Sequence, residues 1–97
     1  MITEAHICAQ IADWLYVHRE HCWWFRPHGH GMQRAGVPDF VGIFKGWGFG
    51  IEVKGPKGKL SLRQRAELLA IAEAGGIAIV AKDVDHVRRC FAERGLA

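Results

Sequence analysis

The segment from Gly36 to Lys54 constrains the fold most strongly, because its residue pattern predicts a β-hairpin. Residues 39–44 and 49–54 are mostly apolar and have the composition of two short strands. Gly46 and Gly48 lie between these stretches and favour a bend of the backbone. We therefore expect two antiparallel strands that are joined at this bend.

The register of this hairpin decides which side chains lie together. If Phe44 pairs with Phe49, then Asp39 lies opposite Lys54. Side chains alternate between the two faces of a strand, so Asp39, Glu52 and Lys54 share one face. The other face is expected to belong to the core, and its residues are Phe40, Phe44, Phe49, Ile51 and Val53. Two carboxylates and an amine against an apolar sheet predict a site for a metal ion and its bound water.

Size and composition limit the classes of protein to which the chain can belong. With 97 residues, of which 49% are hydrophobic, we expect one folded domain over residues 1–97. No apolar run approaches the ~20 residues of a membrane span, and the first residues do not resemble a signal peptide. Three widely separated cysteines are typical of a reducing cytosol. The net charge of +3 mildly favours a polyanionic partner.

Three helices are predicted from capping residues and from the spacing of apolar side chains. The first begins at Glu4, which lies one turn before the buried stripe and points toward the sheet. Ser61 and Gln64 have the spacing of a capping box at the start of the second helix. The last helix begins at Asp83 or Asp85. The expected buried stripe of the second helix consists of Leu62, Ala66, Leu69 and Ala70.

Two further strands complete the predicted sheet. Residues 22–25 have the composition of a short strand, and residues 77–81 lack alternation, which is typical of a strand covered on both faces. The chain from Glu52 to this last strand has the length of a crossover between parallel strands. We therefore expect an α/β fold: a mixed four-stranded sheet flanked by helices, in the order αβββαβ plus a C-terminal helix.

Two short motifs in the hairpin resemble a known nuclease signature. Pro38-Asp39, followed by Glu52-Val53-Lys54, is similar to the signature of the PD-(D/E)xK nuclease superfamily. The predicted order of helices and strands also matches the restriction-endonuclease-like core of that superfamily. Each motif alone is common, but both at this spacing on a predicted hairpin form a specific signal.

Further residues resemble the virus-type replication-repair nuclease (VRR-NUC) group within this superfamily, and the resemblance covers essentially the whole chain. They are Glu4 in the first helix, Gly36 before Pro38-Asp39, and Gln64 at the start of the second helix. Residues 74–81 are similar to the tail of small phage-type members. The loop before the first motif departs from the family, because it is rich in histidine and glycine where amide side chains are expected.

The resemblance implies a nuclease that depends on Mg²⁺ or Mn²⁺ and on no organic cofactor. A divalent cation offsets the negative charge of a phosphodiester and acidifies bound water, and magnesium prefers oxygen ligands. Asp39 and Glu52 would supply two carboxylates, and the backbone carbonyl of Val53 would supply a third oxygen. By the same resemblance, Glu4 reaches the metal region from the first helix, directly or through water.

Lys54 and Gln64 complete the expected catalytic set. The amine of Lys54 would orient the attacking water and offset the charge that develops on the phosphate. Gln64 would hold the water or the amine through hydrogen bonds. The expected reaction is in-line attack by hydroxide, which leaves a 5′-phosphate and a 3′-hydroxyl.

Basic residues around the predicted site are candidates for contacts with DNA phosphates, which carry little sequence information. One group flanks the active strand and the second helix and consists of Lys57, Lys59, Arg63 and Arg65. A second group lies in the loop before the hairpin and consists of Arg26, His28, His30 and Arg34. We therefore expect DNA to be the partner of this chain.

Stand-alone VRR-NUC members are linked to branched DNA, including four-way (Holliday) junctions, so the resemblance implies a structure-specific endonuclease. One domain with one site can cut one strand, whereas a two-fold homodimer would place two sites for paired cuts on a symmetric junction. We therefore expect a homodimer. The phage-type resemblance implies that the protein acts in the cytoplasm of a bacterial host.

Three other functions are compatible with the sequence. The protein could be a nuclease of flap, linear or single-stranded DNA, or a DNA-binding module without catalytic activity. It could also be a zinc-binding accessory protein, because histidine and cysteine can ligate zinc. The candidate zinc ligands are His18, His21, Cys22, His28 and His30.

Several of these residues also have purely structural interpretations. Glu4 can act on the dipole of the first helix, and Gln64 can serve only as a cap. Trp23 and Trp24 would point to opposite faces of their strand, so at most one of them faces solvent. Trp47, near the tip of the hairpin, is the best candidate for an exposed aromatic contact with DNA.

Overall fold

The computed structural model describes residues 2–27 and 34–97. The elements, in chain order, are α1 (Glu4–Val17), β1 (Cys22–Phe25), β2 (Phe40–Phe44), β3 (Trp47–Val53), α2 (Leu62–Glu73), β4 (Ile77–Ala81) and α3 (Val84–Glu93). This order confirms the predicted α/β fold. None of the helices in the described ranges is long and apolar enough to cross a membrane.

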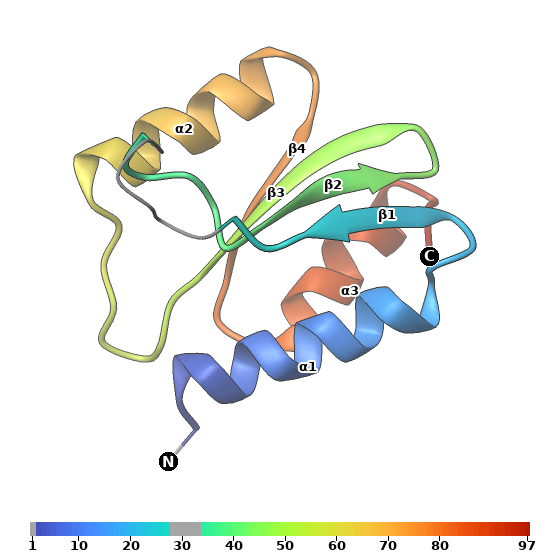
Figure 1. Ribbon diagram of the computed structural model, residues 1–97, viewed down its shortest axis with the longest axis horizontal. Coiled ribbons are helices and arrows are strands. Elements are labelled where there is room, and N and C mark those ends of the chain that lie inside the picture. The colour runs from blue at the N-terminus through green and yellow to red at the C-terminus, as the bar shows by residue number, and fades with distance from the viewer. Residues whose placement is uncertain (1, 28–33) are drawn as a thin grey trace.

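The four strands form one mixed sheet with the order β1-β2-β3-β4. Neighbouring strands from β1 to β3 are antiparallel, whereas β4 is parallel to β3. The connection between these two parallel strands contains α2, as the predicted crossover requires. Helix α2 lies on one face of the sheet, and α1 and α3 lie together on the other face (Figure 1).

The hairpin between β2 and β3 forms as predicted, but its register was predicted wrongly by two residues. Phe44 pairs with Trp47 rather than with Phe49. Continued by one residue, the observed register brings Asp39 opposite Glu52 instead of Lys54. Because two residues are one full period of a strand, the slip leaves each side chain on its predicted face.

A two-residue turn accounts for this register. Lys45 and Gly46 connect the strands, and both have positive φ angles, of 48° and 86°. Hairpin loops of this length need positive φ at their central residues and match the right-handed twist of the strands. Glycine adopts such angles readily, whereas a lysine adopts them at some cost. Gly48, which the prediction placed in the bend, therefore lies within β3.

The core face of the sheet is as predicted, and α1 and α3 pack against it. The buried residues of the hairpin are Phe40, Phe44, Phe49, Ile51 and Val53. The helices contribute Ile7, Cys8, Ile11 and Leu15 from α1, and Val87 and Phe91 from α3. Burial of each large apolar side chain contributes roughly 1.5–3 kcal/mol. This layer fixes α1, and with it Glu4, relative to the sheet.

The inner face of α2 was predicted wrongly. Leu62 and Leu69 are exposed, and Leu68 is buried instead. The stripe that faces the sheet has the spacing i, i+3, i+4, i+7 and consists of Gln64, Glu67, Leu68 and Ile71. Its two polar members bond to Glu52 and to Arg34. Polar residues therefore occupy half of the stripe that faces the sheet, so the spacing of apolar residues alone does not identify it.

Gly42 offers a test of the packing between β1 and β2. A Cβ atom at this position would lie 2.1 Å from the carbonyl oxygen of Trp23, which belongs to the neighbouring backbone and cannot move aside alone. We expect Gly42→Ala to lower the free energy of unfolding by about 1–3 kcal/mol. Gly48→Ala is the matched control, because nothing lies within 4 Å of its Cβ position. Urea unfolding followed by tryptophan fluorescence compares the two variants, and equal stabilities would contradict this account.

Candidate active site

The predicted catalytic residues come from segments that meet at one end of the sheet. Asp39 precedes β2 directly, and Glu52 is the penultimate residue of β3, which Lys54 follows. Because β2 and β3 are antiparallel, the start of one strand lies beside the end of the other. The amino ends of α1 and α2, which carry Glu4 and Gln64, lie at this same end of the molecule (Figure 1).

Glu52 is the centre of this arrangement. Its side chain is only 4% exposed, and it is the one buried charged residue in the described ranges. Its Oε2 atom accepts a hydrogen bond of 3.2 Å from Nε2 of Gln64 and lies 3.7 Å from Nζ of Lys54. Burial raises the pKa of Glu52 from 4.5 to about 7, and the charge and hydrogen bond of Asp39 add to this rise. The positive charge of Lys54 therefore does not fully compensate for the negative charge of the ionised Glu52 carboxylate.

Asp39 is held by the last residue of β3. Its Oδ2 atom accepts a hydrogen bond of 2.7 Å from the backbone N–H of Val53. Its Oδ1 atom lies 3.9 Å from Nη2 of Arg26. The hydrogen bond orients the carboxylate toward Glu52, so the structure brings together the two acids of the predicted motifs.

Glu4 reaches the same region from α1. Its Oε2 atom accepts a hydrogen bond of 3.2 Å from the backbone N–H of Gly55, which follows Lys54. Gly58 packs beside both side chains: a Cβ atom there would lie 3.1 Å from Cδ of Lys54 and 3.4 Å from Oε2 of Glu4. The turn after β3 therefore closes around Glu4 and Lys54.

The three carboxylates share one pattern of bonding. Each is anchored through one oxygen, by the N–H of Val53, by the amide of Gln64 or by the N–H of Gly55. In residues 2–27 and 34–97, no nitrogen forms a hydrogen bond to the second oxygen of any of them. Fixed carboxylates with a remaining oxygen are what an oxygen-ligated cation requires.

The donor set fits a hard divalent cation that keeps several of its waters. Among the residues that the structure describes, no three His, Cys, Asp or Glu side chains form a ready cluster for a metal ion. Asp39 and Glu52 nevertheless lie across from each other where β2 and β3 meet, and the charge of Asp39 helps to raise the pKa of Glu52. Mg²⁺ is commonly held by only one or two carboxylates with waters. A cation bound to both acids would relieve the repulsion that raises the pKa of Glu52.

Gln64 caps α2 as predicted, and its side chain also bonds to Glu52. The side-chain Oε1 atom of Gln64 accepts a hydrogen bond from the backbone N–H of Ser61. The backbone N–H of Gln64 donates to Oγ of Ser61, which completes the capping box of α2. Because the cap occupies the amide oxygen, the amide nitrogen is turned toward Glu52. The start of α2 is thereby joined to the buried carboxylate.

The basic residues predicted to contact DNA fall into different environments. Four of them are exposed and form no ion pair within the described part of the chain: Lys57, Lys59, Arg63 and Arg65. Arg34 pairs with Glu67 of α2, which offsets its charge. Arg26 lies beside Asp39, a proximity that the sequence did not indicate. His28 and His30 lie outside the described residues.

Two of the three candidate zinc ligands that the structure describes, His18 and Cys22, pack within the fold. The Nδ1 atom of His18 is 2.9 Å from the carbonyl oxygen of Trp14, and its ring packs against Trp14 and Phe44. Cys22 is buried in the core. These contacts are those of residues that stabilise the fold.

The tryptophans follow the predicted alternation. Trp23 is 63% exposed, whereas Trp24 packs in part against the core, next to Phe40. Trp47 is partly exposed, and the guanidinium of Arg94 lies over its ring.

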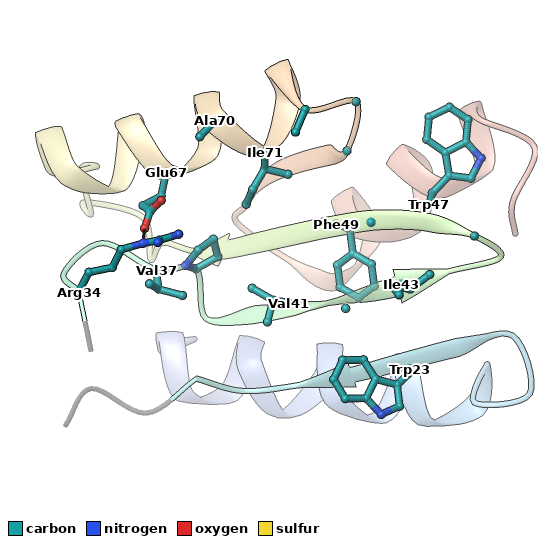
Figure 2. A pocket seen from close by; sticks show the side chains of 17 residues that line it. Trp23, Arg34, Val37, Val41, Ile43, Trp47, Phe49, Glu67, Ala70 and Ile71 are labelled. Atoms are coloured by element: carbon teal, nitrogen blue, oxygen red, sulfur yellow. Dashed lines mark hydrogen bonds and ion pairs between the residues drawn. The ribbon is translucent and has the colours of Figure 1, made fainter. Parts of the chain in front are cut away.

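A groove of about 690 Å³ lies between α2 and the strands β1 to β3. Figure 2 shows Trp23, Val41 and Ile43 on the sheet side of this groove and Ile71 on the side of α2. The ion pair between Arg34 and Glu67 lies at one end of the groove (Figure 2). None of the predicted catalytic residues lines it, so the groove is separate from the carboxylate cluster.

Together, the sheet order, the crossover helix and the paired acids define a restriction-endonuclease-like domain. No protein-family model and no curated protein matches the chain in sequence. A solved structure described as a "VRR_NUC domain protein" is similar over 89% of this chain and 82% of its own, with a TM-score of 0.66 and 20% sequence identity. The chain therefore has the fold of a VRR-NUC domain, which confirms the fold that the resemblance implied.

The raised pKa of Glu52 predicts how stability depends on pH in the absence of metal. Between pH 4.5 and about 7 the folded protein holds a proton that the unfolded chain releases, so stability falls as pH rises through this window. Glu52→Gln removes the ionisable group. We expect this variant to be more stable than the wild type by on the order of 2 kcal/mol at pH 8 and to differ little at pH 4.5.

Urea unfolding in the presence of a chelator at the two pH values measures this difference. The same gain at both pH values would mean that Glu52 does not hold a proton in the folded state.

Proposed function

We propose that the protein is a divalent-metal-dependent endonuclease that hydrolyses phosphodiester bonds in branched DNA as a homodimer. The proposal rests mainly on the meeting of Asp39, Glu52 and Lys54 at one end of the sheet, where hydrogen bonds hold both carboxylates. The fold shared with a protein described as a VRR-NUC domain supports the same function.

Asp39 and Glu52 are the proposed ligands of Mg²⁺ or Mn²⁺, together with the backbone carbonyl of Val53. Glu4 is held at the edge of this region by Gly55, which favours a contact through water over direct ligation. When bound, the cation supplies the positive charge that acidifies water and offsets the charge of the phosphate.

Lys54 and Gln64 act on the water and the phosphate in this proposal. The amine of Lys54 is nearly buried beside Glu52, so it is held where its N–H groups can orient a water and stabilise the negative charge that develops on the phosphate. Gln64 keeps Glu52 in place through its amide nitrogen. In-line attack then leaves a 5′-phosphate and a 3′-hydroxyl.

The DNA backbone would run along the turn after β3 and the first turn of α2. The exposed basic residues there are Lys57, Lys59, Arg63 and Arg65. Their positive charge follows Lys54 directly in the chain, so a phosphate bound by them is guided to the carboxylates. Arg34 contributes less charge, because Glu67 already pairs with it.

A second copy of the chain is the partner that best fits the exposed apolar face of β1 and β2. This face consists of Trp23, Phe25, Val41 and Ile43. A two-fold interface places a surface against itself, so an uncharged surface binds its own copy without repulsion between like charges. None of these four residues carries a positive charge, so this face has no group that would bind a DNA phosphate. The resulting dimer would present two carboxylate sites to the two strands of a junction.

The decisive experiment tests cleavage by single-site variants. We expect the wild type to nick labelled four-way junctions in the presence of Mg²⁺ or Mn²⁺. Asp39→Ala and Lys54→Ala should each lower the rate at least ~10²–10³-fold, the scale for one preorganised charged group. Tyr16→Ala, at the outer surface of α1, is the control and should cut at the wild-type rate. Undiminished cleavage by clean Asp39→Ala protein would refute the site assignment.

The same assay separates the other candidate functions. Faster cleavage of flap, linear or single-stranded DNA than of junctions would assign a different nuclease substrate. Salt-dependent DNA binding without any product would indicate a binding module. Stoichiometric zinc in the purified protein, measured by elemental analysis, would favour the accessory zinc protein.

The proposed dimer can be tested independently of cleavage. Trp23→Glu or Ile43→Glu would place a carboxylate in the interface, opposite its own copy, so we expect both variants to be monomers of 10.9 kDa. Val17→Glu changes an apolar residue on α1 that is even more exposed and should remain a dimer. Size-exclusion chromatography with light scattering measures the three masses. A wild-type protein that is monomeric at high concentration would rule out this partner.

A further inference from the structure

Arg26 is fixed at the edge of the carboxylate cluster by contacts on several sides. It follows β1, and the register of that strand with β2 brings it opposite Phe40. Its guanidinium lies 4.8 Å from the centre of the Phe40 ring, and Nη2 lies 3.4 Å from Sγ of Cys8. Its Nε atom is 3.4 Å from the carbonyl oxygen of Asp39. A side chain held in this way is more than a solvated surface arginine.

The guanidinium of Arg26 faces the carboxylate oxygen of Asp39 that forms no hydrogen bond with the sheet. Oδ2 is bonded to the N–H of Val53, whereas Oδ1 lies 3.9 Å from Nη2 of Arg26. That distance is an ion pair without a direct hydrogen bond. Oδ1 is also the oxygen available to a cation. Arg26 and a bound cation would therefore share one carboxylate oxygen.

The charges around the three carboxylates determine how Arg26 affects the binding of a cation. Three carboxylates gather at this end of the sheet, and Lys54 lies beside one of them. Arg26 supplies the positive charge on the side of Asp39. A divalent cation at Asp39 would be repelled by the guanidinium, so its binding is weaker than the carboxylates alone would allow. A DNA phosphate removes this conflict, because it offers the guanidinium another anionic partner.

We infer that Arg26 couples the binding of the cation to the binding of DNA. In the free protein it pairs with Asp39 and weakens cation binding, and in the complex its remaining N–H groups bind a phosphate oxygen. Nη1 forms no hydrogen bond or ion pair within the described residues, and the side chain is 43% exposed, so these donors are accessible. Guanidinium groups bind phosphate through paired N–H donors. The inference rests on the proposed function, since it requires a cation at Asp39.

Titration with Mn²⁺ in the absence of DNA, followed by electron paramagnetic resonance, tests the coupling without catalysis. Arg26→Gln removes the competing charge, so we expect it to bind Mn²⁺ roughly fivefold or more tightly than the wild type. Arg26→Lys keeps the charge and should bind Mn²⁺ with about the wild-type affinity. At saturating Mn²⁺, both variants should cut junction DNA about tenfold or more slowly, because neither offers the paired donors to the phosphate.

Two controls make the outcome interpretable. Arg19→Gln removes the same charge just beyond the end of α1 that lies far from Glu4, and it should leave Mn²⁺ affinity unchanged. Thermal unfolding shows whether each variant is folded, and folded Arg26→Lys keeps the test valid if Arg26→Gln is unstable. Equal or weaker Mn²⁺ binding by folded Arg26→Gln, with binding lost in Asp39→Ala, overturns the coupling alone. Undiminished Mn²⁺ binding by Asp39→Ala overturns the proposed metal site, and the coupling with it.

Discussion

The hydrogen bond from the N–H of Val53 to Asp39 is the interaction on which the site depends. On its other side β3 is paired with β4, as the bond from the N–H of Lys54 to the carbonyl of Ala81 shows. On the side of β2, the strand begins only at Phe40, so a side chain takes the place of a backbone acceptor. One bond therefore completes the sheet and orients a carboxylate toward the buried Glu52.

The helices stabilise this arrangement from both faces. On one face, the apolar layer under α1 fixes the position from which Glu4 reaches Gly55. On the other face, the capping box of α2 determines which end of the Gln64 amide meets Glu52. The elements that stabilise the fold are thus the elements that position the polar groups. A buried carboxylate is costly by itself, and for Glu52 the amide of Gln64 and the amine of Lys54 offset part of that cost.

Sequence reasoning succeeded where a strict period governs the structure. Alternation along the strands identified the core face and placed Asp39 and Glu52 on the same side, and a slip of two residues could not change that. The turn was misjudged because a positive φ at Lys45 is not evident from its residue type. The inner stripe of α2 was missed because it contains polar residues that bond to the sheet and the loop before β2. Arg26 was expected near DNA, but its place beside Asp39 depends on the pairing of β1 with β2, which no local pattern reveals.

The two-residue turn at Lys45 and Gly46 has an influence far beyond its own position. It lies roughly 20 Å along the strand from Asp39, at about 3.3 Å per residue. Yet its length determines which residue of β3 stands across from that aspartate. Insertions or deletions at this tip would change the register between β2 and β3. A change of one residue would place the two carboxylates on opposite faces of the sheet. A change of two would keep them on one face but separate them along the strand. The length of a surface turn remote from the acids thereby decides whether the two carboxylates meet.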